Sequence, residues 1–312
     1  MNNVELIFGA PGCGKTTYLM DILEKELDTY MPHRVAFVSF TKKGAEEGLS
    51  RAKAKFNLDN KDFPYFRTLH SICFKEQRAS TYDILAKRDY RRFSDAMDMH
   101  FIGYYSEEFY HNDDQYLYMY FLKKNNYAMY KAIRDSGSVD IDIKKLKHIA
   151  LNYNRYKEHY NKIDFTDLLT RTVKQGLQLD IDVAFIDEAQ DLTTLQWEVC
   201  ETLFAKAHKV YIAGDDDQAI YEWTGADINY FLNIKGKRTI LDKTWRLNKE
   251  LLNFSKDISG MIKHRVKKDV SPANKEKGSI QYYNDIFDFE FKDNESYYCL
   301  ARNNVHLKKY IT

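Results

Sequence analysis

Four short runs of apolar and β-branched residues recur along the chain, and each ends at a turn that is polar or contains glycine. They lie at residues 4–8, 35–40, 183–186 and 210–213. Continuous apolar strands separated by helical segments are typical of a parallel sheet covered by helices on both faces. Ligands bind to such sheets where the strands end. We therefore expect an α/β fold whose chemistry lies at the carboxyl edge of a parallel sheet.

The long stretch between the second and third runs has a different character. Residues 75–159 are rich in Tyr, Lys, Asp and Asn and contain no proline. Side chains recur there at helical spacing, for example at Tyr116, Met119 and Tyr120. We expect a helical insertion over 75–159 within a first domain made of residues 1–74 and 160–238. Ordinary connecting helices of one domain are the alternative.

A second set of elements is expected from residue 239 onward. It comprises an apolar run at 240–241, a helix over 248–262, a basic segment at 264–268, a hairpin-like region at 278–283 and a strand at 297–301. Basic runs such as the segment around Arg265 are more often a solvated surface than a binding site. We assign residues 239–312 to part of a second domain.

Composition limits the range of partners. The formal net charge is +1, so no strong overall field attracts nucleic acid, and any such partner must be held by a local patch. The four cysteines are far apart in sequence and include no C-x-x-C pair, which argues against a zinc site or a disulfide framework. No run of about 18 apolar residues is present, so we expect no membrane span and a cytoplasmic location.

The strongest motif follows the first apolar run. Residues 9–16 read Gly-Ala-Pro-Gly-Cys-Gly-Lys-Thr, a complete G-x-x-x-x-G-K-[ST] phosphate-binding loop between a strand and a helix. Backbone N–H groups and the helix N-terminus of such a loop hold a nucleoside triphosphate. Lys15 would reach the β and γ phosphates, and the Thr16 hydroxyl would bind Mg²⁺. The residues expected to contact the nucleotide here are Gly9, Ala10, Pro11, Gly12, Cys13, Gly14, Lys15, Thr16 and Thr17.

The third run ends in two carboxylates, Asp187 and Glu188. After a phosphate-binding loop, Asp187 is expected to hold Mg²⁺ and Glu188 to orient and deprotonate an attacking water. A kinase that transfers phosphate to an acceptor needs no such glutamate. The pair therefore favours hydrolysis.

The fourth run leads into Gly-Asp-Asp-Asp-Gln-Ala-Ile-Tyr-Glu-Trp-Thr-Gly-Ala at residues 214–226. Gln218, just beyond a strand end, could hydrogen-bond the γ phosphate and report its presence. Tyr221 and Trp223 could offer flat faces for stacking bases, although a lone tryptophan is more often a core residue.

In this order, these three motifs resemble those of the UvrD/Rep family of superfamily 1 DNA helicases. Flanking segments are similar as well: Val-Ser-Phe-Thr-Lys-Lys-Gly-Ala at 38–45, Arg-Thr-Leu-His-Ser at 67–71, Ile-Asp-Phe-Thr-Asp-Leu-Leu at 163–169, Thr-Trp-Arg-Leu-Asn at 244–248 and Leu-Ala-Arg-Asn-Asn at 300–304. The resemblance implies a RecA-like ATPase domain with a helical insertion and the start of a second RecA-like domain.

The resemblance also implies an activity and further site residues. The activity is ATP hydrolysis with Mg²⁺, coupled to movement along single-stranded or partly duplex DNA in the 3′ to 5′ direction. Arg246 would reach the γ phosphate from the second domain and stabilise transition-state charge. The residues implied to contact single-stranded DNA are Phe40, Thr41, Thr68, His70, Tyr221 and Trp223.

Two departures from the family pattern qualify this expectation. Only eight residues precede Gly9, which leaves no room for the family's adenine-reading glutamine motif. The sequence also stops about one βα unit after the helix that follows Arg246, before the family's last motifs. We therefore expect a truncated or split form, or a second polypeptide that supplies the rest, and a chain that alone hydrolyses ATP poorly and does not unwind duplex.

Two other functions compete with a helicase. One is a nucleotide-switched single-stranded-DNA-binding ATPase without unwinding activity. The other is a P-loop kinase of a small molecule, which Glu188, Gln218 and the Tyr221/Trp223 pair count against. Stimulation of hydrolysis by single-stranded DNA separates the first two functions from the kinase, and strand displacement separates them from each other.

Overall fold

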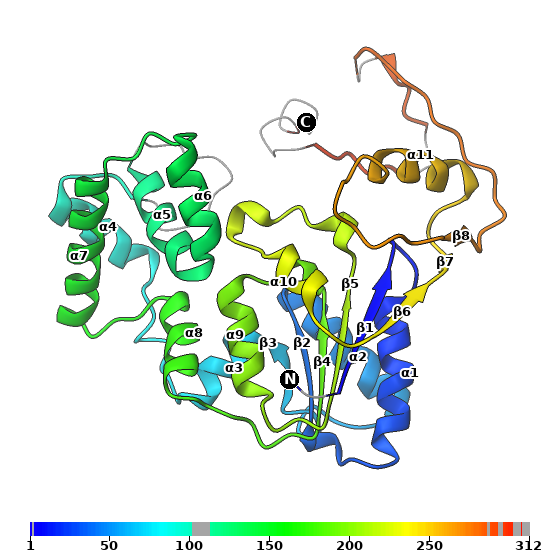
Figure 1. Cartoon of the computed structure of the whole chain (residues 1–312), viewed down its shortest axis with the longest axis horizontal. Helices are drawn as coiled ribbons and strands as arrows, with labels where there is room; N and C mark the ends of the chain where they lie inside the picture. Colours follow the sequence, from blue (N-terminus) through cyan, green and yellow to red (C-terminus); the bar gives the residue numbers. More distant parts are fainter. Residues whose placement is uncertain (2, 102–112, 286–287, 293–295, 302–306, 308–312) are drawn as a thin grey trace.

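Within the described residues, the main sheet has six parallel strands in the order β3-β2-β4-β5-β1-β6 (Figure 1). The strands are β1 (Val4–Gly9), β2 (Val35–Ser39), β3 (Tyr65–Thr68), β4 (Val183–Asp187), β5 (Lys209–Gly214) and β6 (Lys237–Leu241). This computed structural model describes the chain except residues 2, 102–112, 286–287, 293–295, 302–306 and 308–312. The expected α/β fold with a parallel sheet is confirmed, and all four apolar runs form central strands of it.

Two layers of helices cover the sheet, because successive residues of each strand point to opposite faces. On one face, Ile7 and Phe37 pack with side chains of α1 (Lys15–Leu27) and α2 (Lys42–Phe56). On the other face, Leu6 and Val38 share a core with four further helices. These helices are α3 (Leu69–Glu76), α8 (Phe165–Lys174), α9 (Thr194–Leu203) and α10 (Ile228–Asn233). Four short 3₁₀ turns lie between the elements: η1 (Pro32–Arg34), η2 (Ala189–Asp191), η3 (Asp216–Gln218) and η4 (Glu222–Thr224).

Four helices of the central stretch form a unit to one side of the sheet, as Figure 1 shows. They are α4 (Lys87–Met97), α5 (Asp114–Asn125), α6 (Tyr127–Ser136) and α7 (Ile143–His159), and they enclose a hydrophobic cluster of their own. The chain enters and leaves this unit side by side, since Leu85 N–H donates to the Ile163 carbonyl at 2.9 Å. The helical spacing at Tyr116, Met119 and Tyr120 is confirmed, since all three lie in α5, and the boundaries 75–159 stay a prediction.

The region after the main sheet differs from the expectation. Residue 239, the expected start of a second domain, lies inside β6, and β6 pairs with β1 in the first sheet. Beyond it, α11 (Lys249–Ser259) matches the expected helix, and β7 (Lys243–Thr244) pairs in parallel with β8 (Ser271–Pro272).

The predictions of a hairpin at 278–283 and of a strand at 297–301 are wrong, because neither segment is a strand. Their large apolar side chains are exposed, Tyr298 at 93% and Leu300 at 92%, so no neighbouring strand or core holds them extended. Arg302, Asn303 and Asn304 of the expected motif lie outside the described residues. No helix in the described part of the chain is long and apolar enough to cross a membrane.

Candidate active site

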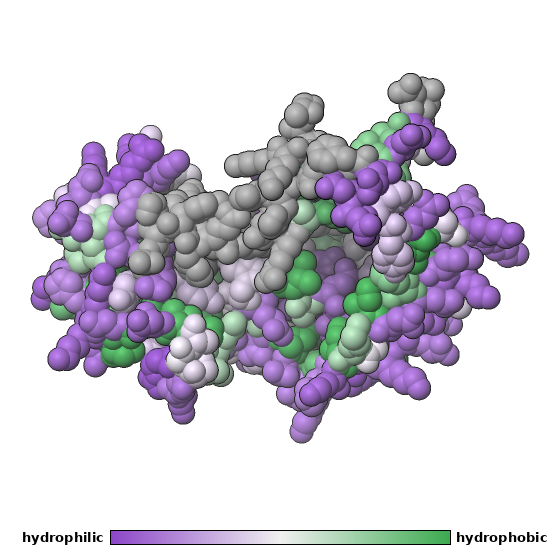
Figure 2. Space-filling view, turned by 90° about the horizontal axis from the view of Figure 1, so that it is seen from above, coloured by the Kyte–Doolittle hydropathy of each residue, from purple (hydrophilic) through white to green (hydrophobic). Residues whose placement is uncertain are grey.

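The polar segments singled out in the sequence converge on the carboxyl edge of the main sheet. The glycine-rich loop (residues 9–16) follows β1, Asp187 ends β4, and the turn containing Gln218 follows β5. Figure 2 looks onto this edge and shows a hollow between the helical unit and the residues that follow β6. Parallel strand order thus brings together residues separated by some 170 to 200 positions in sequence, as for Thr16 and Asp187.

The glycine-rich loop is held by its own backbone and by the first turn of α1. Gly12 and Gly14 have φ angles of +73° and +78°, which favour glycine. Cys13 N–H donates to the Ala10 carbonyl at 3.1 Å, and the Lys15 ammonium donates to the Gly9 carbonyl at 3.0 Å. The result is a curled loop whose lysine lies over it at a helix N-terminus, the arrangement that suits a bound anion.

The segment 244–246 lies directly against this loop. The Thr244 hydroxyl donates to the Pro11 carbonyl at 2.7 Å, and Trp245 N–H donates to the Gly12 carbonyl at 2.9 Å. A Cβ atom built on Gly12 would lie 2.3 Å from the Cβ of Arg246. Arg246 is therefore brought beside the loop, and its exposed guanidinium has no hydrogen bond or ion pair with any residue that the structure describes. Thr17, by contrast, is exposed and accepts a hydrogen bond from Arg51.

A cavity of about 360 Å³ opens next to these residues. Ala10, Pro11 and Gln218 border it on the sheet side, and α11 borders it on the other. Arg265, Lys268 and Val270 also line it, so the cavity lies between the sheet edge and residues that follow β6.

Asp187 and Thr16 are in contact, as magnesium binding by both requires. The Thr16 hydroxyl donates to Asp187 Oδ2 at 2.8 Å. Burial, and then repulsion by Glu188, raise the pKa of Asp187 to about 6. A buried carboxylate whose ionisation is opposed in this way is favoured by a cation beside it, so this pair fits a Mg²⁺ ion.

Glu188 and Gln218 are linked through a residue that the sequence motifs did not single out. Glu188 has a left-handed backbone, with φ +53°, at the end of β4. Its Oε2 accepts from the Gln190 amide at 2.9 Å, and Gln190 Oε1 accepts from Asp215 N–H at 3.0 Å. Asp215 Oδ2 in turn accepts from the Gln218 side-chain amide at 2.6 Å. The two expected catalytic side chains thus lie at opposite ends of one hydrogen-bonded chain.

The basic segment at 264–268 is only partly a solvated surface: His264 and Lys267 are exposed, but Arg265 is half-buried and Lys268 is buried, contrary to expectation. Lys268 is buried and contacts Asp215, Asp216 and Asp217, at 3.0 Å from Asp215 Oδ1. Burial opposes its charge, but the aspartates outweigh that effect and raise the pKa of Lys268 above its ordinary value. Arg265 pairs with Asp217. The sequence did hold a signal for this buried cation: three consecutive aspartates follow a buried strand, and buried carboxylates need cations beside them.

Phe40 and Tyr221 lie together on the exposed side of this edge. Their ring centroids are 5.9 Å apart, and both side chains are half-buried. Trp223 is also half-buried, and the helical unit holds its loop: the Tyr118 hydroxyl donates to the Trp223 carbonyl at 2.9 Å, and the Asn126 amide donates to the Gly225 carbonyl at 3.1 Å. The structure therefore brings Phe40 and Tyr221 together, with Trp223 two residues further along the same turn.

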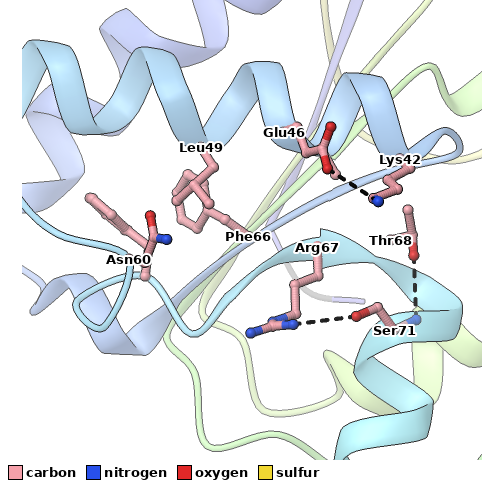
Figure 3. Close-up of a pocket in the computed structure, with 10 residues that line it drawn as sticks. Lys42, Glu46, Leu49, Asn60, Phe66, Arg67, Thr68 and Ser71 are labelled. Atoms are coloured by element: carbon pink, nitrogen blue, oxygen red, sulfur yellow. Dashed lines mark hydrogen bonds and ion pairs between the residues drawn. The ribbon is translucent and has the colours of Figure 1, made fainter. Parts of the chain in front are cut away.

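Thr41 and Thr68 have structural roles that the sequence did not suggest. Each hydroxyl accepts a backbone N–H at the start of a helix, Thr41 from Gly44 and Thr68 from Ser71. Figure 3 shows Thr68 at the rim of a pocket of about 460 Å³ between α2 and β3, with Lys42 and Arg67 also on the rim. As acceptors in helix caps, the two hydroxyls each have one lone pair in use, and their own hydrogens stay free to be donated to a ligand.

His70 packs edge-on against Phe165, with ring centroids 5.7 Å apart. Burial lowers its pKa to about 4, so the imidazole is neutral at pH 7. Any contact that it makes with a phosphate would be a hydrogen bond and not an ion pair.

Comparison with known proteins adds a family to this geometry. Residues 1–239 match the model of the UvrD/REP helicase N-terminal domain. Similar curated proteins include the ATP-dependent DNA helicases PcrA of Staphylococcus epidermidis and Staphylococcus aureus. Each is 24% identical over an alignment 322 positions long, which covers 89% of this chain and 41% of the relative. The chain thus spans less than half the length of the curated relatives that it matches.

Proposed function

The chain belongs to the UvrD/REP helicase family, and on this basis we propose that it is an ATP-dependent DNA translocase module. It binds ATP with Mg²⁺ at the glycine-rich loop, hydrolyses it, and couples hydrolysis to movement along single-stranded DNA. The observation that carries the proposal is the convergence of Lys15, the Thr16–Asp187 pair and the Glu188–Gln218 chain on one sheet edge.

Each of these side chains has a task in hydrolysis. Lys15 and the loop N–H groups bind the phosphates, and Thr16 with Asp187 holds Mg²⁺, which neutralises charge on the phosphate oxygens. Glu188 orients the attacking water and accepts its proton. Gln218 hydrogen-bonds the γ phosphate, and Arg246 stabilises the charge that develops on it.

Trp245 adds a candidate for base recognition. Its indole is 70% exposed, although its backbone is bonded to Gly12 of the loop. A flat, exposed ring beside the phosphate site is suited to stack on the adenine of ATP. We expect Trp245→Ala to raise the KM for ATP severalfold and to change kcat little.

The single strand is proposed to cross the aromatic side of the hollow. Phe40, Tyr221 and Trp223 would stack bases, and the hydroxyls of Thr41 and Thr68 and the neutral His70 would donate to phosphates. Movement in the 3′ to 5′ direction belongs to the proposal through the family resemblance.

The direct test is ATP turnover with and without oligo-dT. We expect stimulation by the single strand, loss of nucleotide binding and turnover in Lys15→Ala, and weaker oligo-dT binding by about 1–3 kcal/mol in Trp223→Ala. The matched control is Tyr282→Ala, which removes an exposed aromatic ring (81% exposed) far along the chain. Turnover that survives in Lys15→Ala would refute the proposal.

Strand displacement then distinguishes the two modes of DNA binding. ATP-dependent release of a labelled strand from a tailed duplex supports a helicase. Stimulated hydrolysis without strand release supports the alternative, a nucleotide-switched ATPase that grips single-stranded DNA without unwinding.

A further inference from the structure

The hydrogen-bonded chain from Glu188 to Gln218 has one further participant, Lys268, which contacts Asp215. Asp215 accepts from Gln218 through Oδ2, and its other oxygen, Oδ1, lies 3.0 Å from the Lys268 ammonium. Asp215 is 0% exposed, and the Lys268 side chain is 1% exposed. An aspartate that orients the expected γ-phosphate sensor is thus itself held by a cation from the segment after α11.

The arrangement fixes which way the Gln218 amide points. A carboxylate accepts hydrogen bonds and cannot donate them, so Gln218 must present its NH₂ group to Asp215. One hydrogen of that NH₂ group is used there, and the second is free for a phosphate oxygen. Without the Lys268 ammonium, Asp215 Oδ1 would lose its ion pair, and the carboxylate would no longer be held in the position from which it selects this amide orientation.

We propose that Lys268 is a positioning residue for Gln218, acting through the carboxylate of Asp215. The inference rests on the proposed function, since it assigns Gln218 the detection of the γ phosphate. It makes the nucleotide site depend on a residue outside the three sequence motifs. The contact between Lys268 and Asp215 thereby becomes a condition for distinguishing ATP from ADP.

Discrimination between nucleotides gives a readout that does not require turnover. We expect the wild-type chain to bind a fluorescent AMPPNP more tightly than the matching ADP, and Lys268→Met to reduce that ratio about fivefold, the effect of one hydrogen bond. The affinity for ADP itself should stay within about twofold, since Lys268 does not contact the glycine-rich loop.

Arg265→Met is the matched control. It removes a cation from the same segment, but Arg265 pairs with Asp217 and not with Asp215, so the ratio should not change. In a Gln218→Ala background, Lys268→Met should have no further effect on the ratio, because the residue through which it acts is gone. A purely structural role would instead reduce the ratio equally in both backgrounds.

Asp215→Asn is the variant to use if the thermal melt of Lys268→Met shows that this protein does not fold. An asparagine keeps the shape but can present its own NH₂ group to Gln218, so the ratio should again fall about fivefold. An unchanged ratio in Asp215→Asn or Lys268→Met, or additive losses with Gln218→Ala, would overturn the inference. A wild-type chain that binds neither nucleotide would overturn the proposed function itself.

Discussion

Gly12 shows at the scale of one residue how closely the glycine-rich loop and the segment 244–246 fit together. It has a positive φ, and a Cβ atom there would collide with the Cβ of Arg246. Gly137 has a similar φ of +66° but nothing within 4 Å of the position of its absent Cβ. Replacing each glycine by alanine therefore measures two costs separately. Gly137→Ala introduces backbone strain alone, and Gly12→Ala introduces backbone strain together with a steric collision.

We expect Gly137→Ala to lower the free energy of unfolding by about 1 kcal/mol, the cost of a left-handed backbone in an L-residue. Gly12→Ala should cost a further 1–3 kcal/mol or so, because the neighbouring chain must move. Urea denaturation of the two variants measures the difference. Equal losses would mean that segment 244–246 does not rest on the loop in solution.

His70 gives a pH-dependent prediction at the same scale. Its folded-state pKa of about 4 lies below the ordinary value of 6.5, so its contribution to stability is fully present above pH 6.5 and is lost as pH falls from there towards 4. At pH 5.5 we expect wild type to have lost about 1 kcal/mol of stability relative to its value at pH 8 through this group. The corresponding loss should be absent in His70→Gln, and urea melts at the two pH values compare the proteins.

At the scale of elements, a buried ion pair joins the helical unit to the sheet. Lys157 near the end of α7 is 5% exposed and contacts Asp164 at 2.6 Å and Asp167 at 2.5 Å, both at the start of α8. Asp164 and Asp167 also cap α8 reciprocally. The Asp-Phe-Thr-Asp motif therefore serves as a helix start and as an anchor for α7.

Removing Lys157 should leave the buried Asp164 without its cation, and Asp167 with Lys124 alone at 3.2 Å. We expect Lys157→Met to lower the free energy of unfolding by about 3 kcal/mol, the typical cost of breaking a buried pair. Lys42→Met is the control, since Lys42 and Glu46 form an exposed pair on α2 and should contribute less than about 1 kcal/mol. Similar losses in both variants would show that α7 is not anchored through this lysine.

The same elements show what the sequence could and could not predict. β1, β2, β4 and β5 were evident because central parallel strands are buried on both faces and read as unbroken apolar runs. The edge strands β3 and β6 lack such runs, and β6 alternates between exposed and half-buried residues. The motifs predicted which residues meet at the sheet edge. Gln190 was given no role, and Lys268 was taken for part of a solvated basic segment, because the partners of both residues become their neighbours only in the fold.

Across the whole molecule, the proposed nucleotide and DNA sites share one turn. Gln218 and Tyr221 are three residues apart after β5, and Lys268 and the helical unit hold that turn from two sides. A ligand that displaces Gln218 is therefore expected to displace Tyr221 as well. Two sites connected in this way are expected to be thermodynamically coupled.

We expect AMPPNP to change the affinity for oligo-dT by at least about fivefold, the lower end of typical coupling. Oligo-dT must then change the affinity for AMPPNP by the same factor. Fluorescence anisotropy of labelled DNA and of labelled nucleotide measures both sides of this relation. Affinities that do not depend on the other ligand would refute coupling through the turn.

The position of β1 has a consequence for how the protein is made. Within this sheet β1 is the first strand to be synthesised, yet both of its neighbours, β5 and β6, belong to residues 209–241. At roughly 5–20 residues per second, this apolar segment waits on the order of ten to forty seconds without a pairing partner. Until then its edges are open to wrong pairing, and the glycine-rich loop that it carries has no sheet to hold it. The glycine-rich loop is thus synthesised before the other two motifs, yet it is among the last segments to reach its native conformation.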